Sequence, residues 1–151
     1  MKNSRQAIDA FLANKTIAVV GVSHNGDKFG NYLYRAVRQA GYKVYAVNPN
    51  LDMAEGDRCY AGLGALPEKP DGVVLVVPPQ ATLQVLDDMG KLGIHSVWIQ
   101  QGADSTEGEK KAAELGINLV SGECLMLFLE PVQSVHRWHR AVRKLIGRIP
   151  K

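Results

Sequence analysis

The chain alternates short apolar runs with longer stretches in which apolar residues recur at helical spacing. The apolar runs, rich in β-branched residues, cover residues 16–21, 43–47, 72–77, 95–99 and 117–120. Each has the length of a strand that is buried on both faces of a parallel sheet. The pattern therefore predicts five β-strands.

The stretches between these runs have the pattern of amphipathic helices. Phe29, Leu33 and Val37, for example, share one face of a helix over residues 28–40. Strands that alternate with helices form a parallel sheet covered on both faces, because parallel strands need crossover connections. We expect helices at residues 4–13, 28–40, 79–92, 105–115 and about 131–146.

Residues 51–70 hold several glycines and prolines, which predict mostly loop with a short strand at Cys59. The expected fold class is α/β, with a doubly wound, Rossmann-like parallel sheet of about five strands. At 151 residues the chain can bury one core and is too short for two ordinary domains, so residues 1–151 are expected to form a single three-layer domain.

Composition limits the class of protein and the cellular location to be expected. Hydrophobic residues make up 46% of the chain and charged residues 22%, as in ordinary globular proteins. The N-terminus lacks the apolar core of a secretory signal, and no apolar run reaches the roughly 18 residues of a membrane span. We expect a cytoplasmic protein without a membrane segment. Its two cysteines, Cys59 and Cys124, are too few and too far apart to predict a disulfide framework or a bound metal.

The net charge of +3 is unevenly distributed along the chain. Residues 131–151 contain no carboxylate, and their basic residues are Arg137, Arg140, Arg143, Lys144, Arg148 and Lys151. Nucleic-acid binding by this segment stays open as an addition to a ligand site, although cations also favour a helix C-terminus without any partner. The apolar residues of the same predicted helix favour packing on the domain or on a second copy of the chain.

The first predicted strand leads into the segment IAVVGVSHNGDKFG, residues 17–30, which is close to two phosphate-binding motifs and matches neither. A dinucleotide fingerprint needs glycine where Ser23 stands and a carboxylate after the second strand, where the chain has Asn48. A Walker loop needs lysine directly after its second glycine, and Asp27 displaces that lysine to residue 28. An NAD(P)-dependent oxidoreductase is therefore an alternative, and nucleotide hydrolysis is disfavoured.

A phosphate-bearing ligand held without metal remains. Backbone N–H groups, the Ser23 hydroxyl and the Lys28 ammonium would bind its phosphates. Coenzyme A has this chemistry, because its diphosphate and 3′-phosphate need cations and N–H donors while its arm needs apolar surface.

Five segments in order along the chain carry a family likeness: IAVVGVS (17–23), GYKVYAVNPN (41–50), VVLVVPP (73–79), VWIQQGA (97–103) and GECLM (122–126). The sequence resembles the small CoA-binding domain proteins, whose fold also forms the front of the succinyl-CoA synthetase α subunit. The likeness implies binding of CoA or an acyl-CoA beyond the carboxyl ends of the strands. It does not imply ligase activity, because the synthetase needs a histidine from a further domain, and we expect a binding protein and not an enzyme.

The resemblance also implies where the ligand lies. It places Gly21, Ser23 and Lys28 around the phosphates, with Asn48 and Pro49 at the end of the second strand. Val22, His24 and Gly30 of the same turn are further candidate contacts, the alternative for His24 being an exposed loop histidine. It places Val77, Pro78 and Pro79 against the adenosine, and Gln100, Gln101 and Gly102 at the exit of the fourth strand. Cys124 is expected to be a small buried cysteine, the alternative being a reactive thiol that forms a mixed disulfide with CoA.

Overall fold

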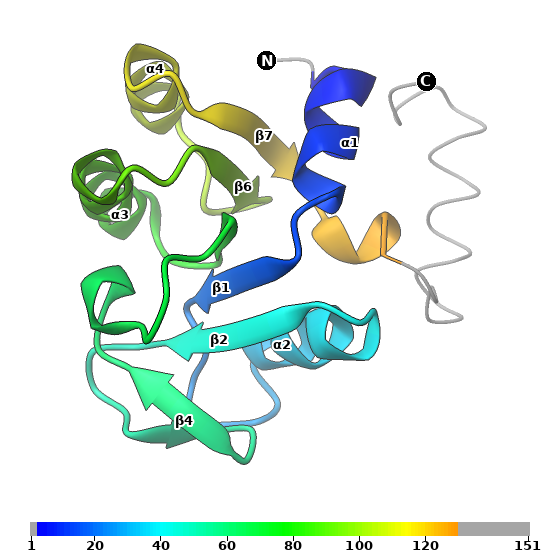
Figure 1. Cartoon of the computed structure of the whole chain (residues 1–151), viewed down its shortest axis with the longest axis vertical. Coiled ribbons are helices and arrows are strands. Elements are labelled where there is room, and N and C mark those ends of the chain that lie inside the picture. The colour runs from blue at the N-terminus through cyan, green and yellow to red at the C-terminus, as the bar shows by residue number, and fades with distance from the viewer. Residues whose placement is uncertain (1–2, 130–151) are drawn as a thin grey trace.

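A seven-stranded sheet forms the centre of the molecule, with the strand order β3-β4-β2-β1-β5-β6-β7 (Figure 1). The structure, a computed structural model, describes residues 3–129. The strands are β1 (Thr16–Val20), β2 (Lys43–Val47), β3 (Met53–Ala54), β4 (Asp57–Tyr60), β5 (Gly72–Leu75), β6 (Ser96–Gln100) and β7 (Asn118–Glu123). The α-helices are α1 (Arg5–Leu12), α2 (Phe29–Gln39), α3 (Pro79–Leu92) and α4 (Thr106–Glu114), and two 3-10 turns are η1 (Leu63–Ala65) and η2 (Leu125–Leu127).

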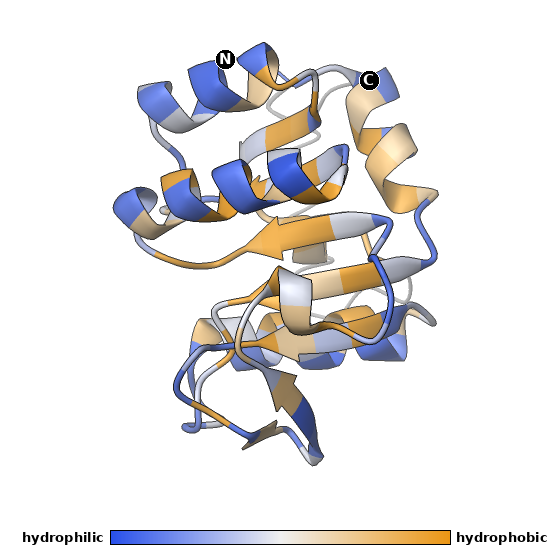
Figure 2. Cartoon of the chain, turned by 60° about the vertical axis from the view of Figure 1, so that its left-hand side comes forward, coloured by the Kyte–Doolittle hydropathy of each residue, from blue (hydrophilic) through white to orange (hydrophobic). Residues whose placement is uncertain are grey.

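The sheet is parallel except for the antiparallel pair of β3 and β4. Helices α1 and α2 pack with η2 on one face, and α3 and α4 pack with η1 on the other. Figure 2 shows hydrophobic residues concentrated along the strands and polar residues along the outer sides of the helices. The expected doubly wound, Rossmann-like α/β fold is confirmed, with seven strands instead of about five.

The two additional strands lie in the stretch expected to be mostly loop. Ala54 pairs with Asp57, so the hairpin turn consists of two residues, Glu55 and Gly56. Both have positive φ, 55° and 77°, as a tight hairpin turn requires. Glutamate is unusual in that conformation, so the residue types of this turn do not predict a hairpin. The short strand expected at Cys59 is confirmed as part of β4.

The face of α2 that packs on the sheet differs from the expected one at its first residue. Leu33 and Val37 are buried as predicted, whereas Phe29 is 42% exposed. Phe29 occupies the first turn of the helix, at the edge of the sheet, so its side chain does not reach the core.

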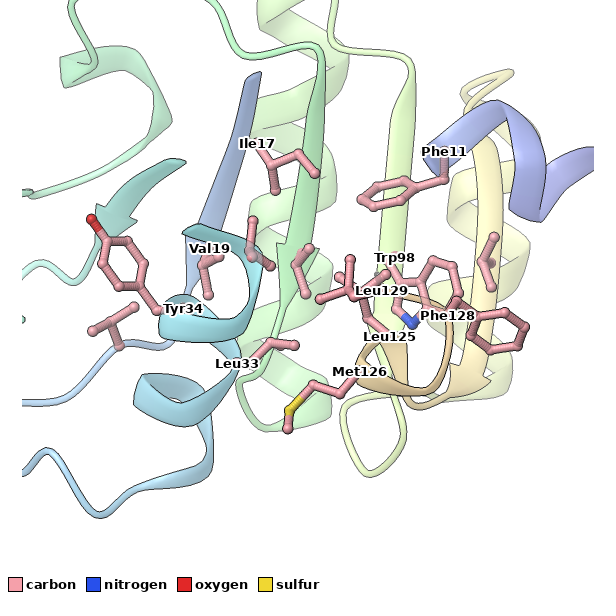
Figure 3. Packing of buried hydrophobic residues seen from close by; sticks show 14 of the residues in the cluster. Phe11, Ile17, Val19, Leu33, Tyr34, Trp98, Leu125, Met126, Phe128 and Leu129 are labelled. Carbon is pink, nitrogen blue, oxygen red and sulfur yellow. The ribbon is translucent and has the colours of Figure 1, made fainter. Parts of the chain in front are cut away.

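The turn η2 closes the core next to α2. Leu125 and Met126 lie over the sheet near Leu33 (Figure 3). Beneath them the buried indole of Trp98 donates a hydrogen bond of 2.8 Å to the carbonyl oxygen of Glu123. Phe128 lies 5.4 Å from the Trp98 ring, centroid to centroid, so aromatic packing holds η2 on the sheet.

The expected helix at about residues 131–146 and the basic residues of that segment lie outside the described residues. Within residues 3–129 no helix combines the length and the apolar character that a membrane crossing requires.

Candidate ligand site at the carboxyl edge of the sheet

The chain changes direction across the sheet between β1 and β5. After β1 the chain continues to β2 on one side, and from β5 onward it continues to β6 and β7 on the other. In open α/β sheets a ligand binds outside the carboxyl ends of the strands at such a switch point. Gly21 and Val76, which follow these two strands, therefore mark the expected site.

Gly21 allows the exits of β1 and β5 to touch. Its φ is +117°, and a Cβ atom added to it would lie 2.2 Å from the carbonyl oxygen of Val76. Gly30, in the first turn of α2, plays a related part, because its added Cβ would lie 2.3 Å from the carbonyl oxygen of Gly21. These two glycines permit the tight turn and the close helix packing for which dinucleotide-binding folds use the first and third glycines of their fingerprint.

Asn31 fixes the turn between these glycines. Its side chain is almost fully buried, and its Oδ1 accepts a 2.8 Å hydrogen bond from the backbone N–H of Ser23. Its Nδ2 donates to the Ser23 carbonyl oxygen at 2.7 Å and to Glu55 Oε1 at 2.9 Å. The backbone of Ser23 is therefore held on both sides by one side chain.

Arg35 joins the same turn to the β3–β4 hairpin. Both terminal nitrogens of its guanidinium donate to the carbonyl oxygen of Gly26 at 3.1 Å, and one of them lies 2.6 Å from Glu55 Oε1. Hydrogen bonds from Arg35 and then Asn31 hold the pKa of the Glu55 carboxyl below its usual value. We call Asn31, Arg35 and Glu55 the turn latch.

Asn48 ties the end of β2 to the turn. Its Nδ2 donates to the carbonyl oxygen of Val22 at 2.8 Å, and its Oδ1 accepts from the N–H of Asn50 at 2.9 Å. The side chain that replaces the ribose-binding carboxylate of dinucleotide folds is thus engaged within the chain. Ligand contact by Asn48 stays a prediction.

The helices that begin at the switch point differ from the others at their N-termini. Ser4 and Ser105 cap α1 and α4 by accepting hydrogen bonds from Ala7 and Gly108. Lys28 and Pro78, which precede α2 and α3, make no side-chain cap in the described part of the chain. Exposed N–H groups of an uncapped helix start attract anions, and α2 adds the charge of Lys28.

The remaining predicted residues fall into two groups. His24, Lys28, Pro49, Pro78, Pro79, Gln101 and Gly102 are exposed along this edge of the sheet, with Val77 partly exposed. Gln100 is only 2% exposed, and its Oε1 accepts a hydrogen bond from the N–H of Leu125. The Gln100 side chain therefore supports η2, and its contact with a ligand stays a prediction.

Sequence reasoning missed the turn latch. An asparagine and an arginine on an amphipathic helix are usually solvated. No residue near Glu55 in the sequence indicates that its side chain contacts α2. Cys124 directly precedes the 3-10 turn η2, and the full burial expected for this cysteine is not found. Its thiol is partly buried.

These residues fit the diphosphate of CoA. Gly21 and Gly30 bring the turn and the start of α2 close together, that start has no side-chain cap, and the exposed Lys28 supplies a cation. The exposed Asp27 is the one carboxylate in the segment 21–30.

Residues 15–130 match the family model of the CoA binding domain. The chain belongs to this family of CoA-binding domains. The expected family resemblance is therefore confirmed.

Two curated relatives are much longer than this chain. The acetate–CoA ligase (ADP-forming) II of Archaeoglobus fulgidus is 32% identical over 100 residues, which cover 65% of this chain and 15% of the ligase. The α subunit of acetate–CoA ligase (ADP-forming) II of Pyrococcus furiosus is 26% identical over 129 residues, which cover 78% of this chain and 28% of the subunit. The chain thus matches only a minor part of each.

A solved structure shows the same fold in a chain of similar size. A conserved hypothetical protein from Pyrococcus furiosus is 37% identical and superposes with a TM-score of 0.71. The match covers 75% of this chain and 97% of that one.

Proposed function

We propose that the protein binds CoA or an acyl-CoA at the switch point between β1 and β5, and that it performs no catalysis on its own. The observation that carries the proposal is the uncapped start of α2 beside Lys28, at the end of a turn that the latch already holds in place. CoA would supply a thiol or thioester for chemistry elsewhere, and this chain would supply binding and orientation.

The proposal assigns each part of the site a role. The N–H groups at the start of α2 and the Lys28 ammonium would bind the diphosphate. Val77 and the exposed ring of Pro78 would give the adenosine an apolar wall without backbone N–H donors from the prolines. NAD is the poorer ligand for this arrangement, because the Asn48 side chain is engaged with Val22 and offers no carboxylate to ribose hydroxyls.

The relatives motivate the second half of the proposal. They are ligases several times longer than the matched segment, so the CoA-binding step is the part of their activity that this chain would share. We infer that the protein presents or stores CoA for a partner, and that the described residues of the carboxyl edge act as binding groups.

Calorimetric titration of the purified chain with CoA, acetyl-CoA, NAD, NADP and ATP tests the proposal. We expect binding of CoA or acetyl-CoA and weak or no binding of NAD and ATP. Tight NAD binding without CoA binding would overturn the proposal. Turnover of acetyl-CoA by the purified chain would overturn its non-catalytic half.

Lys28→Ala gives the same proposal a residue-level test. The variant is expected to weaken CoA binding by roughly 1–3 kcal/mol, about 5- to 150-fold, through loss of a charge-assisted contact. Lys91→Ala is the matched control, because Lys91 is exposed in the last turn of α3, at the opposite edge of the sheet. Equal affinities for the two variants would remove Lys28 from the site.

A further inference from the structure

A hollow lies one strand away from the switch point. Its volume is about 470 Å³, and its lining includes Pro49, Asp52, Arg58 and Tyr60. These residues belong to the carboxyl end of β2, the following loop and β4, which lies beside β2 (Figure 1). The hollow is therefore on the same edge of the sheet as the proposed CoA site.

Two ties connect this hollow to the turn after β1. Pro49, in its wall, directly follows Asn48, whose side chain holds the Val22 carbonyl oxygen at 2.8 Å. The hairpin that carries Arg58 is joined to the turn by the ion pair of Arg35 with Glu55. Since neighbouring strands are about 4.8 Å apart, β4 lies about 10 Å from β1, within reach of one extended ligand.

Arg58 differs from the other arginines nearby. Arg35 and Arg38 are paired with Glu55 and Asp57, respectively. Arg58 has no carboxylate partner among residues 3–129, and its guanidinium stacks 5.2 Å from the ring centre of Tyr60. Stacking on an aromatic ring orients a guanidinium. Its N–H groups stay available for two parallel hydrogen bonds to one anion.

A smaller hollow of about 280 Å³, lined by residues of α2, β2 and β4, also borders Arg58. The hydroxyl groups of its Tyr34, Tyr42 and Tyr45 are each bonded within the chain. Few polar groups are left there for a ligand, so the larger hollow is the better candidate.

We propose that Arg58 recognises the phosphate on the ribose of the ligand and thereby selects CoA over dephospho-CoA; this inference rests on the proposed function. In dinucleotide-binding folds the ribose lies at the end of the second strand, and an arginine nearby accommodates a ribose phosphate. Here Arg58 flanks that strand end.

Calorimetric titration of the full chain with CoA and with dephospho-CoA tests the inference. The natural protein should bind CoA at least about tenfold more tightly, the lower range for a charge-assisted contact. Arg58→Gln should lose most of this preference while its affinity for dephospho-CoA stays within about twofold. Arg58→Lys should keep part of it, because an ammonium keeps the charge and loses the planar fork.

Arg5→Gln is the matched control, since Arg5 is an exposed arginine on α1, and it should leave both affinities unchanged. Equal affinity of the natural protein for CoA and dephospho-CoA overturns the role of Arg58 and leaves the proposed function intact. An equal loss of both affinities in a folded Arg58→Gln also overturns it. Failure of the natural protein to bind either ligand overturns the proposed function itself.

Discussion

The exits of β1 and β6 are built from similar parts and use them differently. Each strand is followed by a glycine with positive φ, 117° at Gly21 and 96° at Gly102, and then by a helix. After β6 the polar groups are satisfied within the chain, because Ser105 caps α4 and Gln100 supports η2. After β1 the side chains fix the backbone of the turn, and no side chain caps the start of α2 within the described residues.

This difference indicates which helix N-termini beside a parallel sheet are available to a ligand. A helix N-terminus whose N–H groups are bonded by its own cap has a structural role. One that is left uncapped, while the turn before it is held by other side chains, is suited to an external anion. Of these two exits, that of β6 is closed and that of β1 is open, and four substitutions test the distinction.

Substitution of the two glycines should give the largest contrast. Gly21→Ala brings a methyl group to 2.2 Å from the carbonyl oxygen of Val76 at a φ that alanine disfavours. We expect it to lower the free energy of unfolding by more than about 3 kcal/mol and to abolish CoA binding. Gly102→Ala meets no atom within 4 Å, so only its strained φ should count, about 1–2 kcal/mol.

Urea unfolding and calorimetry of both glycine variants provide the measurement. Equal stability losses at Gly21 and Gly102 would show that the exits of β1 and β5 can separate. In that case the close contact at the switch point is not required by the fold.

Glu55→Gln should have the next largest effect, because it removes the charge from the turn latch and keeps its shape. The side chains of Glu55 and Arg35 are 11% and 29% exposed, so the lost ion pair should lower the free energy of unfolding by about 1–3 kcal/mol. CoA affinity should fall with it, since the Gly26 end of the turn loosens. Glu114→Gln, in an exposed pair with Lys110, is the control and should change neither by more than about 0.5 kcal/mol.

The pH dependence of this effect has a definite sign. Hydrogen bonds from Arg35 and Asn31 lower the pKa of Glu55 in the folded protein. The resulting stabilisation is complete above the pKa of the unfolded chain and is lost as the pH falls through the folded pKa. The stability difference between the natural protein and Glu55→Gln should therefore shrink below about pH 4 in urea unfolding series. A constant difference down to pH 2 would contradict the role of the charge.

Ser105→Ala should have the smallest effect and is informative for that reason. Loss of the cap at the closed exit should cost about 1 kcal/mol of stability and leave CoA affinity unchanged. A clear loss of CoA affinity in a folded Ser105→Ala protein would show that the exit of β6 takes part in binding.

The central strands could be predicted because each is a β-branched apolar run buried on both faces, a pattern visible in the sequence itself. The β3–β4 hairpin could not, because its turn depends on Glu55 in a conformation usually left to glycine or asparagine. The amphipathic pattern also overextended the buried face of α2 to Phe29, since periodicity does not show where a helix leaves the sheet.

For the site, the glycine positions could be predicted and the side chains that organise them could not. In the sequence, Gly21 and Gly30 form an imperfect dinucleotide-binding fingerprint. In the structure they allow the close approach of β1 to β5 and of α2 to the turn after β1. The latch joins Arg35 to Glu55 across 20 positions, a contact that only the tertiary fold creates. Gln100 shows the reverse, because its place beside the exit of β6 did not reveal that its side chain points inward.

The turn latch also has a consequence for the timing of binding. Because Asn31, Arg35 and Glu55 hold the turn in the free protein, the entropy cost of ordering it falls on folding and not on association. Under the proposed function CoA would meet a preformed surface, and its rate of capture would depend on diffusion and on attraction to Lys28 instead of on closure of a loop. Under the proposed function we therefore expect fast association of CoA at the exit of β1, with the lifetime of the complex set by its dissociation rate.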